Sequence, residues 1–233
     1  MAGQTLSVGF KNSTDRTWTM GIYQTLPSSP GLVSVAWKQT SSPQGGQSSV
    51  RWTVDYNVAI ANYFQEGAIG VYESSQVLPS LLGKAWEVVY NAPVQELQPA
   101  GDAPQRDQII INNNSGRNAN LGIGMSGVGS VFKSNVNSGA QAQFVVTPTY
   151  WAALFNDVVL GQVISSNVTI MPLILEFSGG ITRIDLEAWL EGQTLRFGEV
   201  NTGNFVSTPL TLVHSRLALL SQGAGALQAH RAR

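Results

Sequence analysis

Apolar and polar residues alternate along short segments of the chain, with the period of a half-buried β-strand. In residues 17–23, apolar Trp18, Met20 and Ile22 alternate with Thr and Gly, and residues 50–56 alternate in the same way. Successive side chains of a strand point to opposite faces of a sheet, so this spacing predicts one buried face and one solvent-facing side. The pattern therefore predicts sheets that each cover a core with one face.

Segments of this kind recur along the whole chain, separated by clusters of Gly, Pro, Asn and Ser that are typical of turns. We expect strands over residues 5–11, 17–24, 33–38, 49–56, 68–72, 85–90, 108–113, 119–125, 130–133, 142–147, 167–176, 183–189, 194–200 and 205–213. Helical periodicity is scarce. The spacing of Leu210, Val213, Leu217 and Leu220 suits a helix face, although a continuing strand fits Leu210 equally well. The sequence predicts an all-β fold with a short C-terminal tail that is helical in one interpretation.

The two halves of the chain resemble each other in the same order. The segment KNSTDRTWTMGIY, from residue 11, resembles the segment NNSGRNANLGIGM, from residue 113. Tyr150 is the counterpart of Tyr56. A repeated order is what duplication of a sandwich module produces. We predict two tandem antiparallel β-sandwich units, jelly-roll or Ig-like, related by duplication, with one long sandwich as the alternative. The predicted limits are 1–92 for the first sandwich, 93–106 for a proline-containing linker, 107–213 for the second sandwich and 214–233 for the tail.

Composition narrows the possible partners. Charged residues make up only 12% of the chain and the net charge is −1, with no cluster of basic residues. Phosphate neutralisation requires a basic stripe, so nucleic-acid binding is not expected. A charge-poor surface is easily desolvated and repels sister molecules weakly, which favours a homo-oligomer. The chain has no cysteine, which excludes disulfides, thiolate metal sites and a cysteine nucleophile.

The sequence predicts neither a signal peptide nor a membrane-spanning helix. The N-terminal MAGQTLSVGF lacks the basic start and apolar run of a signal peptide, and no apolar stretch approaches the roughly 20 residues of a membrane-spanning helix. We expect a cytoplasmic protein, or one exported by a non-classical route.

Two short motifs resemble those of enzymes but sit in the wrong context. GIGMSG at residues 122–127 resembles a dinucleotide fingerprint, yet the glycine- and serine-rich residues after it do not predict the required helix. Ser130 and Lys133 have the Ser-x-x-Lys spacing of penicillin-recognising enzymes, but in a strand they would point to opposite faces. Both motifs are interpreted as ordinary strand sequence.

The remaining routes to catalysis are few. The chain has two histidines, His214 and His230, and a solitary histidine is more often a packed residue than a catalyst. Asp185 and Glu187 lie two residues apart, so a strand would place both on one side, as a glycosidase pair requires. Nothing around them indicates a cleft. We therefore predict no catalytic residue, no metal site and no cofactor, and not an enzyme.

Aromatic residues suggest binding. Most should lie in the core, but Tyr23, Tyr63 and Tyr72 stand beside predicted turns, where an exposed ring could stack on a sugar or enter a membrane interface. These three tyrosines are the predicted ligand-binding residues.

We predict a non-enzymatic recognition protein that presents loop-borne polar and aromatic groups to a glycan, a membrane surface or a protein partner. A self-assembling structural subunit is the first alternative, because charge-poor strand edges invite pairing. The second is a pore-forming toxin, because residues 120–146 interleave apolar and polar residues as a membrane-inserting β-hairpin does. An ordinary sandwich hairpin is the simpler interpretation of that segment.

Overall fold

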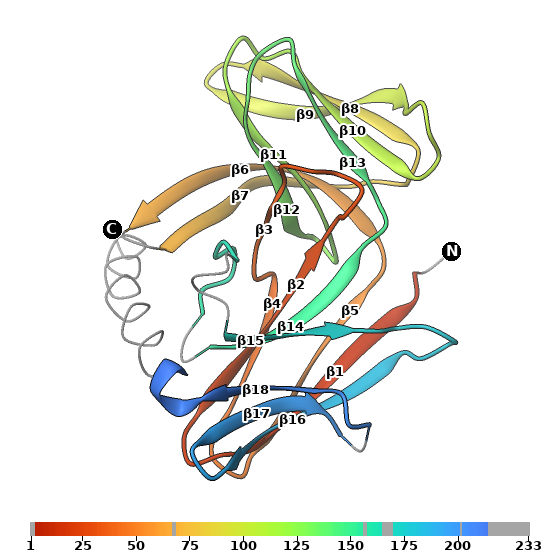
Figure 1. Cartoon of the computed structure of the whole chain (residues 1–233). Coiled ribbons are helices and arrows are strands. Elements are labelled where there is room, and N and C mark those ends of the chain that lie inside the picture. Colours follow the sequence, from red (N-terminus) through yellow and green to blue (C-terminus); the bar gives the residue numbers. More distant parts are fainter. Residues whose placement is uncertain (1–2, 67–68, 156–157, 165–169, 201, 214–233) are drawn as a thin grey trace.

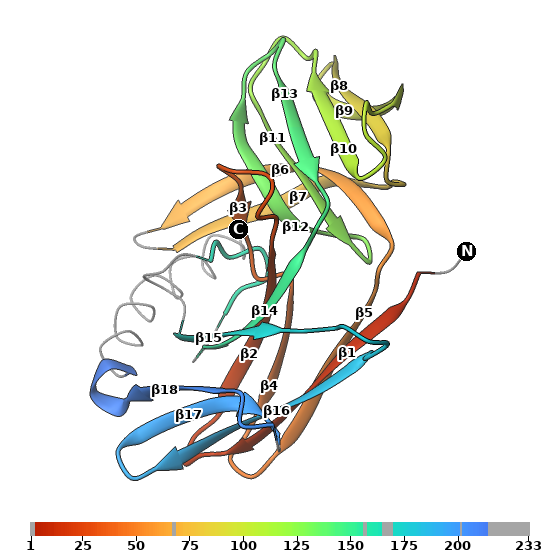
Figure 2. The same cartoon turned by 45° about the vertical axis from the view of Figure 1, so that its right-hand side comes forward.

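The computed structural model describes residues 3–66, 69–155, 158–164, 170–200 and 202–213. Within them the chain is almost entirely β-structure, in four sheets that form two pairs of facing layers (Figures 1 and 2). The all-β prediction is confirmed. We call the pair in the lower half of Figure 1 the lower sandwich and the other pair the upper sandwich.

The lower sandwich is assembled from both ends of the chain. Sheet A, in the order β18-β17-β16-β1-β5, contains β1 (Thr5–Ser13), β5 (Gln47–Thr53), β16 (Arg183–Glu191), β17 (Thr194–Glu199) and β18 (Phe205–Pro209). Sheet B, in the order β15-β14-β2-β4, contains β2 (Trp18–Thr25), β4 (Lys38–Ser42), β14 (Thr149–Phe155) and β15 (Ile170–Leu175). Because β1 pairs in parallel with β16 and antiparallel with β5, strands from both chain ends meet inside one sheet.

The upper sandwich uses one nearly continuous stretch of chain. Sheet C, in the order β3-β12-β11-β6-β7, contains β3 (Val33–Ser34), β6 (Tyr56–Glu66), β7 (Ile69–Pro79), β11 (Ala119–Met125) and β12 (Val128–Val136). Sheet D, in the order β13-β10-β8-β9, contains β8 (Lys84–Asn91), β9 (Val94–Asp102), β10 (Gln108–Asn113) and β13 (Gln141–Val145). Only the short β3 comes from outside residues 56–145 among the described residues of these sheets.

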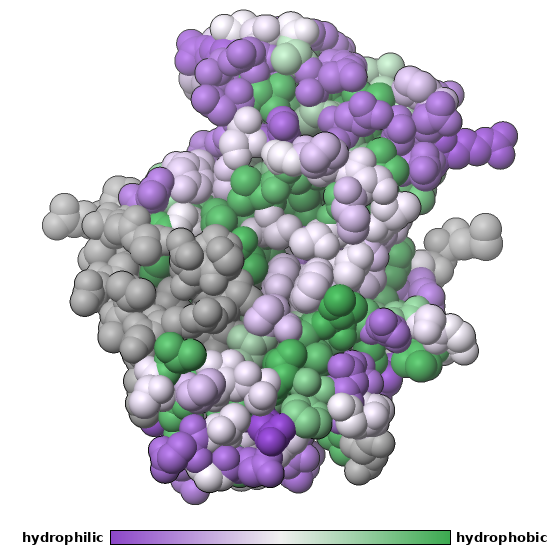
Figure 3. Space-filling view, in the orientation of Figure 1, coloured by the Kyte–Doolittle hydropathy of each residue, from purple (hydrophilic) through white to green (hydrophobic). Residues whose placement is uncertain are grey.

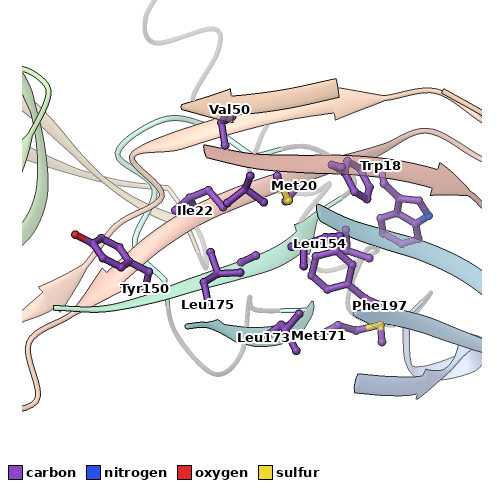
Figure 4. Close-up of a cluster of buried hydrophobic side chains, with 14 of the residues drawn as sticks. Trp18, Met20, Ile22, Val50, Tyr150, Leu154, Met171, Leu173, Leu175 and Phe197 are labelled. Carbon is purple, nitrogen blue, oxygen red and sulfur yellow. The ribbon is translucent and has the colours of Figure 1, made fainter. Parts of the chain in front are cut away.

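Each sandwich has its own hydrophobic core. Between sheets A and B, Trp18, Leu154 and Phe197 lie together near one end of the core and Tyr150 lies toward the other (Figure 4). Between sheets C and D, residues such as Leu121 fill the equivalent space. Burying these alternating apolar side chains removes their surface from water, and this is the main force that holds the facing sheets together.

The two sandwiches repeat the same order of strand pairs. In the upper one, β10 lies between antiparallel β13 and parallel β8, as β1 lies between antiparallel β5 and parallel β16 in the lower one. Likewise β11 lies between β12 and β6, as β2 lies between β4 and β14. Corresponding positions can therefore be assigned from the registers, for example Val8 to Ile109 and Met20 to Leu121.

The chain is divided between the sandwiches differently from the predicted limits. The resembling segments 5–53 and 108–145 do occupy corresponding places, but their partner strands come from elsewhere in the chain. The predicted linker 93–106 largely forms β9, which pairs with β8. The duplication itself stays a prediction. Residues 210–213 form a helical turn, and the predicted tail 214–233 lies outside the described residues.

Strand β2 is buried on both faces, whereas the alternation predicted a half-buried strand. Its inward side chains join the lower core, while on the other face Gly21 lies against the ring of Phe155. Tyr23 packs on that face with a separate cluster that includes Val158. The second cover comes from a segment remote in sequence, so local alternation could not predict it.

Candidate functional site

A hollow of about 510 Å³ opens at one end of the upper sandwich, between its two sheets. Polar residues cover much of this part of the molecular surface (Figure 3). The hollow is lined by β6, β7, the β8–β9 hairpin, the β10–β11 turn and the start of β11. The lining residues are Ile60, Ala61, Asn62, Ser75, Gln76, Tyr90, Pro93, Val94, Gln95, Glu96, Arg117, Asn118, Ala119 and Asn120. We call this hollow the end groove.

The β10–β11 turn beside the groove is held by a fully buried asparagine. Asn113 Nδ2 donates to the carbonyl oxygens of Arg117 and Val136, at 2.7 Å each. The hydroxyl of Ser115 donates to Asn113 Oδ1 at 2.7 Å. An amide side chain that bonds the backbone of its own turn fixes that turn. Arg117 and Asn118 are therefore held at a defined place on the rim.

Glutamine side chains hold the opposite wall of the groove. Gln95 Nε2 donates to Ser115 Oγ at 2.7 Å and to the Asn118 carbonyl at 3.3 Å, which ties the β8–β9 hairpin to the β10–β11 turn. Gln76 Oε1 accepts from the Leu97 amide at 2.7 Å, which ties β7 to β9. These bonds join elements of both sheets, so the groove is built on a rigid frame.

An arginine and a tyrosine form the edge of the groove. The Arg117 guanidinium carbon lies 4.1 Å from the centre of the Tyr90 ring, a cation–π contact. The Tyr90 side chain is 37% exposed, and neighbouring Val94 is 50% exposed. The edge thus offers an accessible aromatic ring, an apolar side chain and guanidinium N–H donors in one place.

The corresponding end of the lower sandwich is filled. Asn12 makes the same turn as Asn113, donating to the Arg16 and Ser42 carbonyls at 2.7 and 2.8 Å. Ala119 of the groove corresponds to Trp18, which is 1% exposed and donates from Nε1 to Thr14 Oγ1 at 3.1 Å. The end groove is therefore a feature of one sandwich and not of the architecture in general.

The tyrosines that the sequence predicted for binding lie elsewhere, and two of them are buried. Tyr23 is 6% exposed and stacks on Trp151, with ring centroids 5.9 Å apart. Burial raises the pKa of Tyr23 well above its usual value. Tyr72 is 5% exposed and stacks on Phe132. Both rings face packed neighbours, because segments far along the chain cover them, so neither presents a free face to a ligand.

Tyr63 is the one member of the predicted set that is exposed. Its side chain is 42% exposed, and its ring lies 4.9 Å from that of Tyr72. Its hydroxyl donates to Gln65 Oε1 at 3.0 Å. Tyr23 and Tyr63 belong to different sheets and have no contact with the end groove, so the structure does not assemble the three residues into one site.

Other sequence candidates have structural partners. Asp185 forms an ion pair with Arg183 at 2.6 Å, and Glu187 accepts from Lys11 at 2.8 Å and from Ser13 at 2.6 Å. Residues 120–146 do not form one hairpin: they contribute β11 and β12 to sheet C and β13 to sheet D. His214 and His230 lie outside the described residues.

The groove residues were missed, although one sequence feature could have revealed them. When Met20-Gly21-Ile22 is aligned with Leu121-Gly122-Ile123, Trp18 falls opposite Ala119, so a large core residue has a small one as its counterpart. Such a change at a corresponding position predicts an unfilled space. No local pattern marks Tyr90, because its contact with Arg117 depends on the pairing of β8 with β10.

Neither a membrane helix nor a metal cluster is found in the part of the chain that the structure describes. None of the helices there is both long and apolar enough to cross a membrane. The same residues contain no group of three or more His, Cys, Asp or Glu side chains arranged to hold a metal ion.

The fold and the groove define a two-sandwich β-protein with one polar, open end. A family profile named RhiA matches residues 3–196, which run from just before β1 into the start of β17. The chain belongs to the RhiA family. It is 27% identical over 177 residues to Protein RhiA of Rhizobium leguminosarum bv. viciae, an alignment that covers 70% of this chain and 73% of that protein. No solved structure matches the chain.

Proposed function

We propose that this protein is a non-enzymatic recognition protein that binds an oligosaccharide in the end groove. The observation that carries the proposal is the chemistry of the lining: several amide side chains surround a groove with an exposed tyrosine at its edge. Sugar rings carry hydroxyl groups around their edges and C–H groups on their faces. Amides supply paired donors and acceptors for the hydroxyls, and a tyrosine ring supplies an apolar surface for the C–H face.

Some of these amide groups are available to a ligand. Among the described residues, no hydrogen bond involves the side chain of Asn62 or the Oε1 atom of Gln95. Asn118 donates from Nδ2 to Asn135, which orients its amide at the rim. Because Gln95 and Asn118 are already held by hydrogen bonds, little side-chain freedom is lost when a ligand binds.

Filling the groove tests the proposal directly. The registers of β8 with β9 and of β16 with β17 make Leu195 the counterpart of Gln95, and Leu195 is buried in the lower core. The variant Ala119→Trp/Gln95→Leu therefore gives the groove the residues found at these two positions of the lower sandwich, Trp18 and Leu195. We expect this variant to lose oligosaccharide binding on a glycan array and in calorimetry, whereas the wild type binds. Thermal melting verifies that the variant is folded.

A milder pair of variants separates the groove from the surface around it. Asn62→Ala removes a lining amide and should weaken binding about fivefold to tenfold, the effect of losing one neutral hydrogen bond. Gln143→Ala removes an exposed amide from β13, outside the groove, and should leave binding unchanged. Binding by the filled variant with wild-type affinity would contradict the proposal, as would binding to lipid vesicles alone.

We also propose, as a second candidate function, self-association through the β7–β8 loop. Leu81 in this loop is 71% exposed and Leu82 is 38% exposed. Hollows of about 370 and 540 Å³ lie beside Leu81, and Trp86 lines the smaller one. A projecting side chain and a hollow on the same patch are self-complementary, so a two-fold axis would place each Leu81 in the hollow of a second copy.

Sedimentation velocity tests this second candidate. We expect a concentration-dependent dimer that Leu81→Asp abolishes, because the added carboxylate would be buried without a partner. Ile181→Asp is the matched control, since Ile181 is also exposed, at 48%, but lies in the lower sandwich. A wild type that stays monomeric at high concentration would remove the candidate.

A further inference from the structure

The end groove contains a cation without a carboxylate partner. Among its lining residues, the charged ones are Arg117 and Glu96. The Glu96 carboxylate accepts from Asn91 Nδ2 at 3.4 Å. Within the described part of the chain no ion pair joins Arg117 to any acid, and its guanidinium rests on the Tyr90 ring. A guanidinium in this state keeps its N–H donors for a ligand.

The corresponding arginine of the lower sandwich has an acidic neighbour. Arg16 lies 3.6 Å from the carboxylate of Asp15, the residue just before it. In the upper turn the residue before Arg117 is Gly116, which has no side chain and a positive φ of 73°. The same turn thus carries an acid–arginine pair where the sandwich end is filled and a lone arginine where it is open.

We propose that the end groove takes a carboxylate-bearing saccharide and that Arg117 selects it over a neutral one. The planar guanidinium fork matches a carboxylate with two parallel hydrogen bonds, and stacking on Tyr90 fixes the plane of that fork. A uronic acid presents this carboxylate beside ring hydroxyls that the lining amides can bind. The inference rests on the proposed function, because it names the sugar class for the same groove.

Calorimetry with two matched probes tests the inference: a uronic-acid oligosaccharide and the neutral oligosaccharide of the same linkage and length. We expect the wild type to bind the acidic probe about tenfold to a hundredfold more tightly, the effect of one hydrogen bond between charged groups. Arg117→Gln should remove this preference, because it takes away the charge that distinguishes the two probes. Arg117→Lys should keep part of the preference for the acidic probe, because an ammonium group supplies the positive charge but not the two parallel N–H donors of a guanidinium.

Controls separate the outcomes. Arg106→Gln removes an exposed arginine of the same sandwich outside the groove and should keep the preference. Equal binding of both probes by the wild type would overturn the acidic specificity and leave the proposed function standing, whereas binding of neither would contradict both. An equal loss of both probes in Arg117→Gln would show that Arg117 only positions Tyr90. Equally tight binding of an oligoglutamate peptide would show that the ligand is an acidic peptide and not a saccharide.

Discussion

The two sandwiches differ most clearly at the ends where their Asn-Ser turns lie. Both ends have a buried asparagine that bonds two backbone carbonyls, followed by a hydroxyl residue that bonds the asparagine. In the lower sandwich the Thr14 hydroxyl then accepts from the Trp18 indole, and in the upper one the Ser115 hydroxyl accepts from Gln95. One frame therefore supports either a filled core or an open polar groove.

This difference shows how few changes convert a structural end into a candidate binding end. The hydroxyl receives a donor in both cases, so replacing an indole by an amide leaves no buried polar atom of the turn without a partner. In the lower sandwich the Trp18 indole occupies a position that is open at Ala119 in the upper one. The groove thus depends on a small residue at the start of β11 and an amide at Gln95, and not on a new loop.

The strongest test of this difference between the two sandwich ends is to remove Trp18, the residue that fills the lower end. Trp18→Ala should lower the free energy of unfolding by about 3–5 kcal/mol, because it leaves a large cavity and removes the indole donor from Thr14. Ala119→Gly at the corresponding upper position should cost much less, since the groove is already open. Urea unfolding measures both. Similar losses in the two variants would show that the upper end is as tightly filled as the lower.

The turns themselves should be equivalent. Asn12→Ala and Asn113→Ala should each cost about 2–3 kcal/mol, because each change leaves one buried and one partly buried carbonyl oxygen, and a hydroxyl, with fewer partners. In Asn113→Ala the rim residues Arg117 and Asn118 also lose their support, so ligand binding should weaken. Chemical unfolding and calorimetry measure these effects. Unchanged stability in either variant would contradict the structural role given to the turn.

Local patterns predicted much of the fold, and the reason is clear in β5. There the exposed Arg51 lies between buried Val50 and Trp52, as alternation predicts, because one face of the strand meets solvent. The strand positions and the resemblance of the two Asn-Ser turns were visible in the same way. The segment around Val94 was predicted as a linker instead, because its glycine and prolines resemble a loop, and only pairing with β8 makes it a strand.

Long-range packing decided what the patterns could not. Tyr23 stands before a turn and was expected to be exposed, yet remote residues cover its ring. Conversely, Tyr90 was given no role, although it forms the edge of the groove with Arg117. Their contact arises because β8 pairs with β10, and no feature of either local sequence encodes this pairing. For the same reason the sequence did not predict that β1, near the start of the chain, pairs with the distant strand β16.

Tyr150 of the lower sandwich and Tyr56 of the upper one occupy corresponding positions. Their burial can be tested by measuring stability at alkaline pH. Burial, and then the neighbouring charge of Tyr56, raises the pKa of Tyr150, and burial also raises that of Tyr56. A raised pKa in the folded state means that stability is fully present below the unfolded pKa of about 10 and is lost as the pH rises above it. The slope should reach about 1.4 kcal/mol per pH unit for each such tyrosine.

Unfolding measured from pH 8 to 11, together with tyrosinate absorbance, checks this expectation. Tyr150→Phe should reduce the alkaline slope, because the buried hydroxyl whose pKa is raised is then absent. An alkaline slope that is the same in the wild type and in Tyr150→Phe would contradict the burial of this ring between the sheets.

The smallest expected effect concerns corresponding glutamates on the outer faces of sheets A and D. Burial acts to raise the pKa of Glu187, but hydrogen bonds from Lys11 and Ser13 outweigh it, so the pKa is lowered. In the upper sandwich Glu87 accepts from an amide, that of Asn114, at 3.1 Å instead. A lowered pKa means that the stabilisation is present above the unfolded pKa of about 4.3 and disappears as the pH falls through the folded value.

Glu187→Gln should therefore cost less than about 1 kcal/mol near pH 7, because the partner Lys11 is half exposed and its charge is screened by solvent. Below pH 4 the cost should fall toward zero, since the wild-type carboxylate is then protonated as well. Lys11→Met should remove most of this pH dependence, because it takes away the cation that favours the carboxylate. Urea unfolding of the three proteins at several pH values measures the difference. If Glu187→Gln lowers the free energy of unfolding equally at pH 3 and pH 7, Glu187 stabilises the pairing of β1 with β16 by packing and not by charge.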